Sequence, residues 1–193
     1  MEDPIAQFQR WLKEAGNHPA ITEPTAMTLA TATTDGRPSA RIVLLKACDA
    51  SGFLFYTNLN SRKGGELKQN PHAALCFYWM PMGRQVRVEG SLTPASDAEA
   101  DAYFISRPRS RQIGAWASQQ SRPLASREEL DNNVAALEKK YQGQDVPRPP
   151  HWGGWRLKPT TIEFWQASDA RLHVRELYTR NLSGQWTESL LYP

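Results

Sequence analysis

A chain of 193 residues is the usual size of one domain, and burial of roughly 70% of its extended surface leaves room for a core. The 23 Lys and Arg against 20 Asp and Glu give a net charge of +3, too small to indicate a nucleic-acid or membrane protein. Cys48 and Cys76 lack the spacing of a zinc site or a disulfide framework, so we expect reduced thiols, no metal site and a cytoplasmic protein. The longest apolar run, residues 73–80, is too short to span a bilayer, and charges interrupt the N-terminal stretch where a secretion signal would lie.

The first half of the chain predicts a short helix followed by antiparallel strands. Ile5, Phe8 and Leu12 recur at helical spacing within residues 4–15, and Gly16 ends this helix. Alternation and β-branched residues, separated by turn residues, then indicate five strands, at residues 26–34, 39–47, 52–58, 72–80 and 84–92.

The second half predicts one helical insertion followed by more strands. Ser96 with Glu99, and Ser126 with Glu129, are capping boxes within an insertion at about residues 96–141. After a proline-rich linker, strands are expected at 155–158, 161–166, 171–180 and 185–191, within the C-terminal part 151–193. We therefore expect a single domain, residues 1–193, that is mainly β with flanking helices: an antiparallel barrel.

Two stretches of the first half carry more positive charge than the fold requires. Ideal strand geometry over residues 41–46 places Arg41 and Lys46 on opposite faces, and these cations could equally be strand ends that snorkel. In residues 60–67, Ser61 can cap a helix whose first turn is basic. Cations there oppose the helix dipole unless an anion binds the free N–H groups, and the alternative is a solvated loop.

Residues 106–116 concentrate three arginines around a proline. Arg107, Arg109 and Arg111 repel one another unless an anion gathers at least one of them, and the guanidinium fork suits phosphate. Interleaved aromatic residues make nucleic acid a competing ligand. The low net charge and the absence of a longer basic stripe in the sequence favour a small phosphorylated ligand.

Residues 171–175 combine a histidine with two arginines. Alternation along a strand would place Arg171, His173 and Arg175 on one face. A lone histidine is more often structural than catalytic. Neighbouring positive charge disfavours the protonated ring, however, and suits a neutral donor or acceptor.

Several of these stretches belong to a longer series of motifs. In order along the chain stand RIVLLK, FYTN followed by SRKG, RQVRVEG, YFISRPRSRQIGAWAS, QSRPL, HWGGWRL, IEFWQ and RLHVR. From about residue 5 to the C-terminus, the chain thereby resembles the pyridoxine 5′-phosphate oxidase family. The resemblance implies a homodimeric FMN-binding split barrel, with FMN in a cleft between subunits. It also implies oxidation of pyridoxine or pyridoxamine 5′-phosphate to pyridoxal 5′-phosphate, with O2 as electron acceptor and hydrogen peroxide as product.

The resemblance also implies which residues form the site. FMN would be bound by Arg41, Ile42, Val43, Leu44, Leu45, Lys46, Tyr56, Thr57, Arg62, Lys63, Gln85, Gln120, Ser121, Trp165 and Arg175. The substrate phosphate would be held by Lys46, Tyr103 and Arg107, with Arg111 where relatives usually have Ser. Because Arg41 and Lys46 face opposite ways on an ideal strand, this assignment requires a twist, a bulge, or a site that wraps the strand end.

Arg171 and His173 would be the catalytic residues, lying against the substrate ring. Hydride would pass from C4′ of the substrate to N5 of FMN, with neutral His173 accepting the departing proton and Arg171 positioning the ring.

Three departures from the family pattern bear on substrate affinity and turnover. They are Arg111, Val174 in place of an acidic residue, and the lack of a basic N-terminal segment in this sequence. Two alternatives therefore stand beside the vitamin B6 enzyme. One is a related FMN-dependent oxidase with another substrate, and the other is a nonenzymatic binder of FMN, pyridoxal phosphate or nucleic acid.

Overall fold

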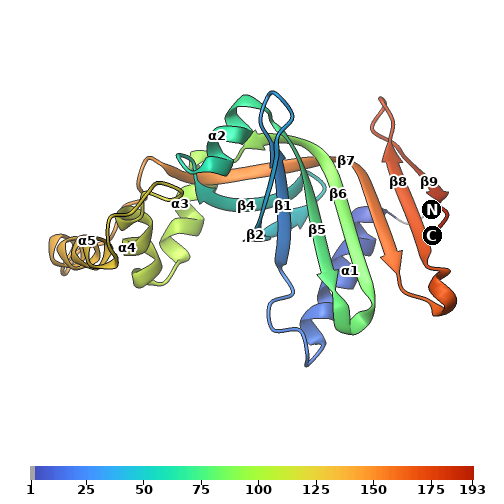
Figure 1. Cartoon of the computed structure of the whole chain (residues 1–193), viewed down its shortest axis with the longest axis horizontal. Coiled ribbons are helices and arrows are strands. Elements are labelled where there is room, and N and C mark those ends of the chain that lie inside the picture. Colours follow the sequence, from blue (N-terminus) through green and yellow to red (C-terminus); the bar gives the residue numbers. More distant parts are fainter. Residues whose placement is uncertain (1–2) are drawn as a thin grey trace.

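The computed structural model describes residues 3–193, whose strands form one antiparallel sheet with helices at its sides (Figure 1). The strands are β1 Ala26–Ala32, β2 Pro38–Leu44, β3 Ala47–Asp49, β4 Gly52–Asn58, β5 His72–Trp79, β6 Arg84–Pro94, β7 Trp152–Gln166, β8 Val174–Arg180 and β9 Trp186–Leu190. Their order is β2-β1-β5-β6-β7-β4-β3, with β8 also paired to β7 and β9 to β8. The expectation of a mainly β, antiparallel split barrel is confirmed.

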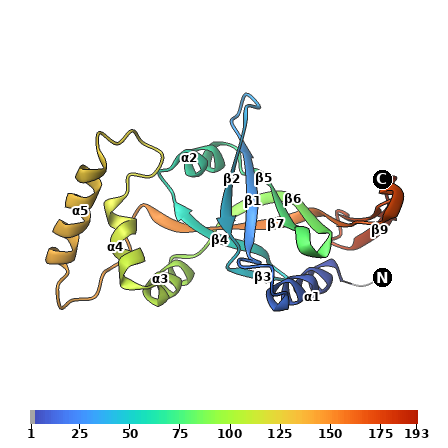
Figure 2. The ribbon, with the colours of Figure 1, turned by 60° about the horizontal axis from the view of Figure 1, so that its bottom comes forward.

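Five α-helices flank this sheet within residues 3–193: α1 Pro4–Asn17, α2 Arg62–Gln69, α3 Asp97–Ser106, α4 Arg109–Ala117 and α5 Arg127–Lys140. Helices α3 to α5 form an arm at one end of the sheet, and β8 and β9 lie at the other end (Figures 1 and 2). The expected capping box at Ser96 is present, since Ser96 and Glu99 exchange hydrogen bonds, whereas at Ser126 only the N-cap half of the box is found, in which Ser126 accepts from the backbone of Glu129. No helix in the described part of the chain is long and apolar enough to cross a membrane.

The predicted strand 39–47 is wrong as a single element. Strand β2 ends at Leu44 and β3 begins at Ala47, because the chain changes partners between them. The backbone N–H of Leu45 donates to Thr25 O, and that of Lys46 donates to Leu54 O. Arg41 and Lys46 therefore do not alternate along one strand, and their side chains can serve the same site.

Two other predicted boundaries are also wrong. The expected strands 155–158 and 161–166 are one continuous strand, β7, in which Pro159 stands opposite Gly90 at a register shift. An irregular ladder tolerates a residue that has no N–H to donate. Residues 169–171 form a 3-10 turn with Arg171 at φ 61°, and β8 begins only at Val174. The predicted one-face arrangement of residues 171–175 on a strand therefore does not occur.

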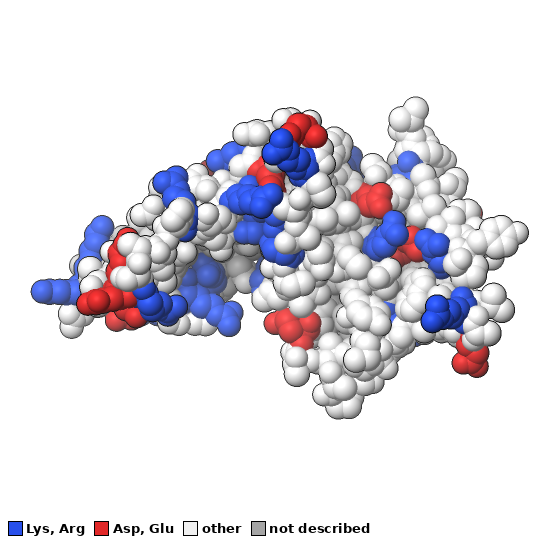
Figure 3. Space-filling model, in the orientation of Figure 1, with Lys and Arg blue, Asp and Glu red and all other residues white. Residues whose placement is uncertain are grey.

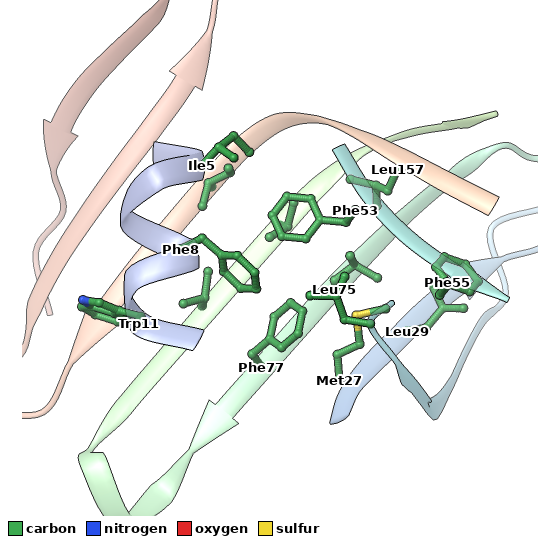
Figure 4. Packing of buried hydrophobic residues seen from close by; sticks show 14 of the residues in the cluster. Ile5, Phe8, Trp11, Met27, Leu29, Phe53, Phe55, Leu75, Phe77 and Leu157 are labelled. Carbon is green, nitrogen blue, oxygen red and sulfur yellow. The ribbon is translucent and has the colours of Figure 1, made fainter. Parts of the chain in front are cut away.

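The main core is formed by α1 packing onto the sheet. Phe8 of α1 is fully buried, and its ring centroid lies 4.9 Å from that of Phe53 on β4 and 4.9 Å from that of Phe77 on β5 (Figure 4). A second cluster, which includes Phe104, Ile113 and Trp152, attaches the helical arm to the start of β7. Two cores therefore hold the sheet and the arm in a fixed relation.

A buried carboxylate fixes α2 on the hairpin of β1 and β2. Glu66 accepts hydrogen bonds from the hydroxyls of Thr31 and Ser39, the second at 2.7 Å, and from Arg62 Nε at 2.9 Å. Burial alone would raise the pKa of Glu66, but these donors and the charge of Arg41 outweigh it and lower the pKa to about 2. The carboxylate is therefore ionised in the folded chain at every ordinary pH.

Replacing Phe8 by Ala should destabilise the protein by about 3–5 kcal/mol, because the side chain is fully buried and a cavity would remain between helix and sheet. Urea unfolding at a fixed protein concentration measures the change. Lys13→Ala, on the exposed side of the same helix, is the control and should shift stability by no more than about 0.5 kcal/mol. Equal effects of the two changes would contradict the assigned packing.

The contribution of Glu66 to stability should depend on pH. Its pKa is about 2 in the folded chain against an ordinary value of 4.5, so the stabilisation is complete above pH 4.5 and is lost as the pH falls toward 2. The difference in unfolding free energy between the wild type and Glu66→Gln should therefore shrink over this range. Urea titrations at several pH values test this, and a difference independent of pH would refute it.

Candidate functional site

A cleft of about 810 Å³ lies between the helical arm and the strands β2 and β4, with α2 beside it. Its volume falls in the range of small-molecule and cofactor sites. Basic side chains gather on both sides of this hollow (Figure 3). The predicted site residues that line it are Arg41, Ile42, Val43, Leu44, Lys46, Tyr56, Thr57, Arg62, Lys63, Tyr103, Arg107, Arg111, Gln120 and Ser121.

One wall of the cleft is basic and comes from β2 and the start of α2. Ser61 caps α2, as predicted, by accepting a hydrogen bond from the backbone of Gly64. Lys63 is 8% exposed, and its Nζ donates to Gln120 Oε1 at 2.7 Å. Burial, helped by the nearby charge of Arg41, lowers the pKa of Lys63 to about 8. A buried ammonium beside a guanidinium is a site that an anion would stabilise.

The opposite wall is aromatic and carries a second group of cations. The ring of Tyr56 stacks on Tyr103 with centroids 4.4 Å apart and on Trp152 with centroids 5.1 Å apart. The guanidinium of Arg107 lies 4.8 Å from the centroid of Trp152, and Lys46 Nζ lies 5.7 Å from that of Tyr103. The rings thus form a platform beside Arg107, which lies between α3 and α4, and Lys46, which lies between β2 and β3.

Arg107 has an unsatisfied donor at this wall. Its Nη1 atom is buried and has no hydrogen-bond partner among residues 3–193, and burial lowers the pKa of the guanidinium. Leaving a buried charged donor unpaired is costly, so this N–H group is available to a ligand anion in the cleft. Arg109, by contrast, donates to the backbone oxygens of Tyr141 and Gln144, so this arginine is structural.

The remaining predicted residues do not line the cleft. Leu45 is 3% exposed and belongs to the main core. Gln85, Trp165 and Arg175 face one another across β6, β7 and β8, where Gln85 pairs with Trp165 and Trp165 with Arg175. The ring of His173 lies 4.7 Å from that of Trp165. We call Gln85, Trp165, Arg171, His173 and Arg175 the β8 set.

Local contacts orient two members of the β8 set. Arg175 Nε donates to the buried carboxylate of Glu163 at 2.8 Å, and this bond raises the pKa of Arg175. His173 Nδ1 accepts a hydrogen bond from the backbone N–H of Ser168 at 3.3 Å. In the neutral ring the proton is then on Nε2, which can act as a donor.

Trp152 and Glu66 are not among the site residues predicted from the sequence. Trp152 completes the aromatic platform, and the glycines after it allow this packing, since a Cβ on Gly154 would lie 2.8 Å from the ring of Tyr56. The adjacent tryptophan and glycines in HWGGW were the available signal for this close approach. Glu66 follows Arg62 by four residues, a spacing that indicates only a common helical ion pair.

Comparisons with known proteins agree along the whole chain. Residues 17–141 match the family model described as pyridoxamine 5′-phosphate oxidase, and residues 152–193 match that of the pyridoxine 5′-phosphate oxidase C-terminal dimerisation region. A pyridoxine/pyridoxamine 5′-phosphate oxidase of Myxococcus xanthus strain DK1622 is 57% identical over 191 residues, covering 99% of this chain and 92% of its own. The Rhodospirillum rubrum protein of the same name is 57% identical and covers 99% of this chain and 96% of its own.

Solved structures support the same assignment. PhzG from Burkholderia lata 383, in complex with tetrahydrophenazine-1-carboxylic acid, has a TM-score of 0.94 and 37% identity, covering 100% of this chain and 94% of its own. A pyridoxamine 5′-phosphate oxidase-related, FMN-binding protein from Nostoc punctiforme has a TM-score of 0.78 at 17% identity, and the match covers both chains fully. This second likeness shows the fold alone. The chain belongs to the pyridoxamine 5′-phosphate oxidase family of oxidoreductases, which confirms the resemblance seen in its motifs.

Proposed function

We propose that the protein oxidises pyridoxine 5′-phosphate or pyridoxamine 5′-phosphate to pyridoxal 5′-phosphate, using FMN and O2 and releasing hydrogen peroxide. The observation that carries this proposal is the presence of two groups of cations in one cleft. Arg41, Arg62 and Lys63 come from β2 and α2, whereas Arg107 and Arg111 come from the helical arm. Two separate groups suit two phosphorylated ligands, and relatives at 57% identity are named for this activity.

FMN fits the basic wall. Its phosphate would be held by Arg41, Arg62 and Lys63, where the buried ammonium of Lys63 and the half-buried guanidinium of Arg41 stand beside the capped start of α2. Such a helix start presents free N–H groups to an anion. When bound, FMN would supply the electron acceptor for the substrate and pass the electrons on to O2.

The substrate phosphate fits the second group of cations. Arg107 has a buried donor to offer, and Lys46 and Tyr103 stand beside it in the cleft. Arg111 lines the same region and adds a second guanidinium that can bind a dianionic phosphate.

The β8 set reaches the cleft only if two subunits combine. Trp152 of the aromatic platform and Trp165 of the β8 set lie on the same strand, thirteen residues apart. That separation amounts to up to roughly 40 Å of extended chain. In a homodimer, which the matched dimerisation region supports, the β8 set of one subunit would complete the cleft of the other.

Arg171 and His173 would then act on the substrate. Arg171 is exposed on a turn and would orient the substrate ring. The neutral imidazole of His173, packed beside Trp165, would accept on Nδ1 the proton that leaves the hydroxyl or amine at C4′, which requires the 3.3 Å hydrogen bond from the backbone N–H of Ser168 to that nitrogen to open. The free thiols of Cys48 and Cys76 are consistent with a reducing compartment, and we place the reaction in the cytoplasm.

A second candidate is oxidation of a different substrate by the same cleft. The PhzG structure, 37% identical to this chain, holds a carboxylic acid that has no phosphate. A nonenzymatic binder of FMN, pyridoxal phosphate or nucleic acid is a further alternative. These candidates differ in what reduces the bound flavin.

Anaerobic titration separates these candidates. The purified protein should be yellow, should bleach when pyridoxine 5′-phosphate is added without oxygen, and should regain its colour in air. Protein bleached only by a different reductant would select the second candidate. Colourless protein that binds no FMN would overturn the proposal.

Arg107→Ala should raise KM for pyridoxine 5′-phosphate about ten- to a hundredfold with little change in kcat, because the contact with the phosphate exists in the ground state and the transition state alike. Steady-state kinetics measures both constants. Arg127→Ala removes the same charge from an exposed site on α5 and is the control. A fall in kcat alone would contradict the assigned role.

A further inference from the structure

Glu66 lies behind the basic wall rather than in it. Its side chain is 5% exposed, and it is not among the residues that line the cleft. One carboxylate oxygen, Oε2, accepts from Thr31, Ser39 and Arg41, and the other, Oε1, accepts from Arg62. A single buried carboxylate thus links the two arginines of the basic wall.

Arg41 is held on several sides by this network. Its Nη2 lies 3.3 Å from Glu66 Oε2, and its Nη1 donates to Leu29 O at 3.2 Å and to Thr31 Oγ1 at 2.5 Å. Thr31 is itself buried. These contacts therefore hold the guanidinium in the basic wall of the cleft without any ligand.

The cations of this wall oppose one another. The charge of Arg62 lowers the pKa of Arg41, and the charge of Arg41 lowers that of Lys63, in each case in addition to the larger effect of burial. Glu66 is a carboxylate that contacts both arginines. Without it, repulsion would favour side-chain positions in which Arg41 and Arg62 point apart.

We propose that Glu66 is a positioning residue for the phosphate of FMN, acting through Arg41 and Arg62. The proposal rests on the FMN site proposed above. The proposal predicts that loss of Glu66 weakens FMN binding. Charge repulsion alone would predict the opposite, because removing a carboxylate near a phosphate should strengthen binding. We expect the gain from preorganisation to exceed this repulsion. The carboxylate holds both guanidinium groups in place before FMN binds, so their side chains do not have to be ordered on binding.

The test compares FMN with riboflavin, which has the same ring system but no phosphate. Quenching of flavin fluorescence on addition of apoprotein gives both dissociation constants. Glu66→Gln, which keeps the shape of the side chain, should weaken FMN binding about tenfold and riboflavin binding by less than about twofold. A general loss of structure would weaken both ligands equally, and unchanged or tighter FMN binding would overturn the proposal.

A double-mutant comparison tests the route through the arginines. In an Arg41→Ala, Arg62→Ala background, Glu66→Gln should change FMN affinity by less than about twofold, since the residues on which it acts are gone. The same tenfold loss in both backgrounds would refute the proposal. If Glu66→Gln does not fold, Glu66→Asp takes its place in the same comparison. Glu66→Asp should then weaken FMN binding in the otherwise wild-type protein and leave it unchanged in the Arg41→Ala, Arg62→Ala background.

Asp35→Asn is the matched control. Asp35 pairs with Arg37 at 2.9 Å, as Glu66 pairs with its arginines, but both residues are exposed at the turn between β1 and β2. This variant removes one negative charge and should leave FMN affinity unchanged. If the wild-type protein itself binds no FMN, the proposed function fails; if the wild type and Glu66→Gln bind FMN equally, only the role of Glu66 fails.

Discussion

The cleft depends on holding like charges close together. Arg41, Arg62 and Lys63 are brought to one wall by β2 and α2, where burial opposes the charges of Arg41 and Lys63, and neighbouring cations repel one another. The fold offsets part of this cost with the carboxylate of Glu66, and in the proposed function the phosphate of FMN would offset more of it. A second buried carboxylate pairs with an arginine at the far end of the sheet, where Glu163 binds Arg175. Under the proposed function, stability and ligand binding are linked, because the FMN phosphate would be bound by the same charges whose repulsion the fold must offset.

Strand β7 runs from the cleft to the β8 set. It pairs with β4 beside the cleft and with β8 at the other end, and β6 runs along most of its length. Trp152 at its start belongs to the aromatic platform, and Trp165 near its end belongs to the β8 set. A continuous strand keeps these parts apart within one chain. In the proposed function a second subunit would bring the two parts together, and the match of residues 152–193 to a C-terminal dimerisation region supports a homodimer.

Relatives and structural neighbours of this chain are named for different ligands. PhzG, 37% identical to this chain, has been solved with a carboxylic acid, whereas relatives at 57% identity are named for phosphorylated substrates. In this chain the helical arm presents Arg107 with an unpaired buried donor and Arg111 beside it. Guanidinium groups in this number favour a dianion over a carboxylate.

Sequence alone determined the features that depend on neighbouring residues. The helix caps at Ser61, Ser96 and Ser126, the helical insertion and most strands follow from local spacing, and the structure contains them. The motifs were specific enough to identify the family, which the comparisons confirm. The roles of individual site residues remain predictions, although most of those residues line one cleft.

The tertiary structure decided the features that depend on distant partners. The break after Leu44 arises because the backbone of Lys46 pairs with Leu54, and the turn at Arg171 lies where a continuous strand was expected. The burial of Glu66 under two arginines and the separation of the β8 set from the cleft likewise have no local signal. Periodicity reports which way a side chain faces on a regular element, whereas contacts between elements determine where that element ends and which charges it meets.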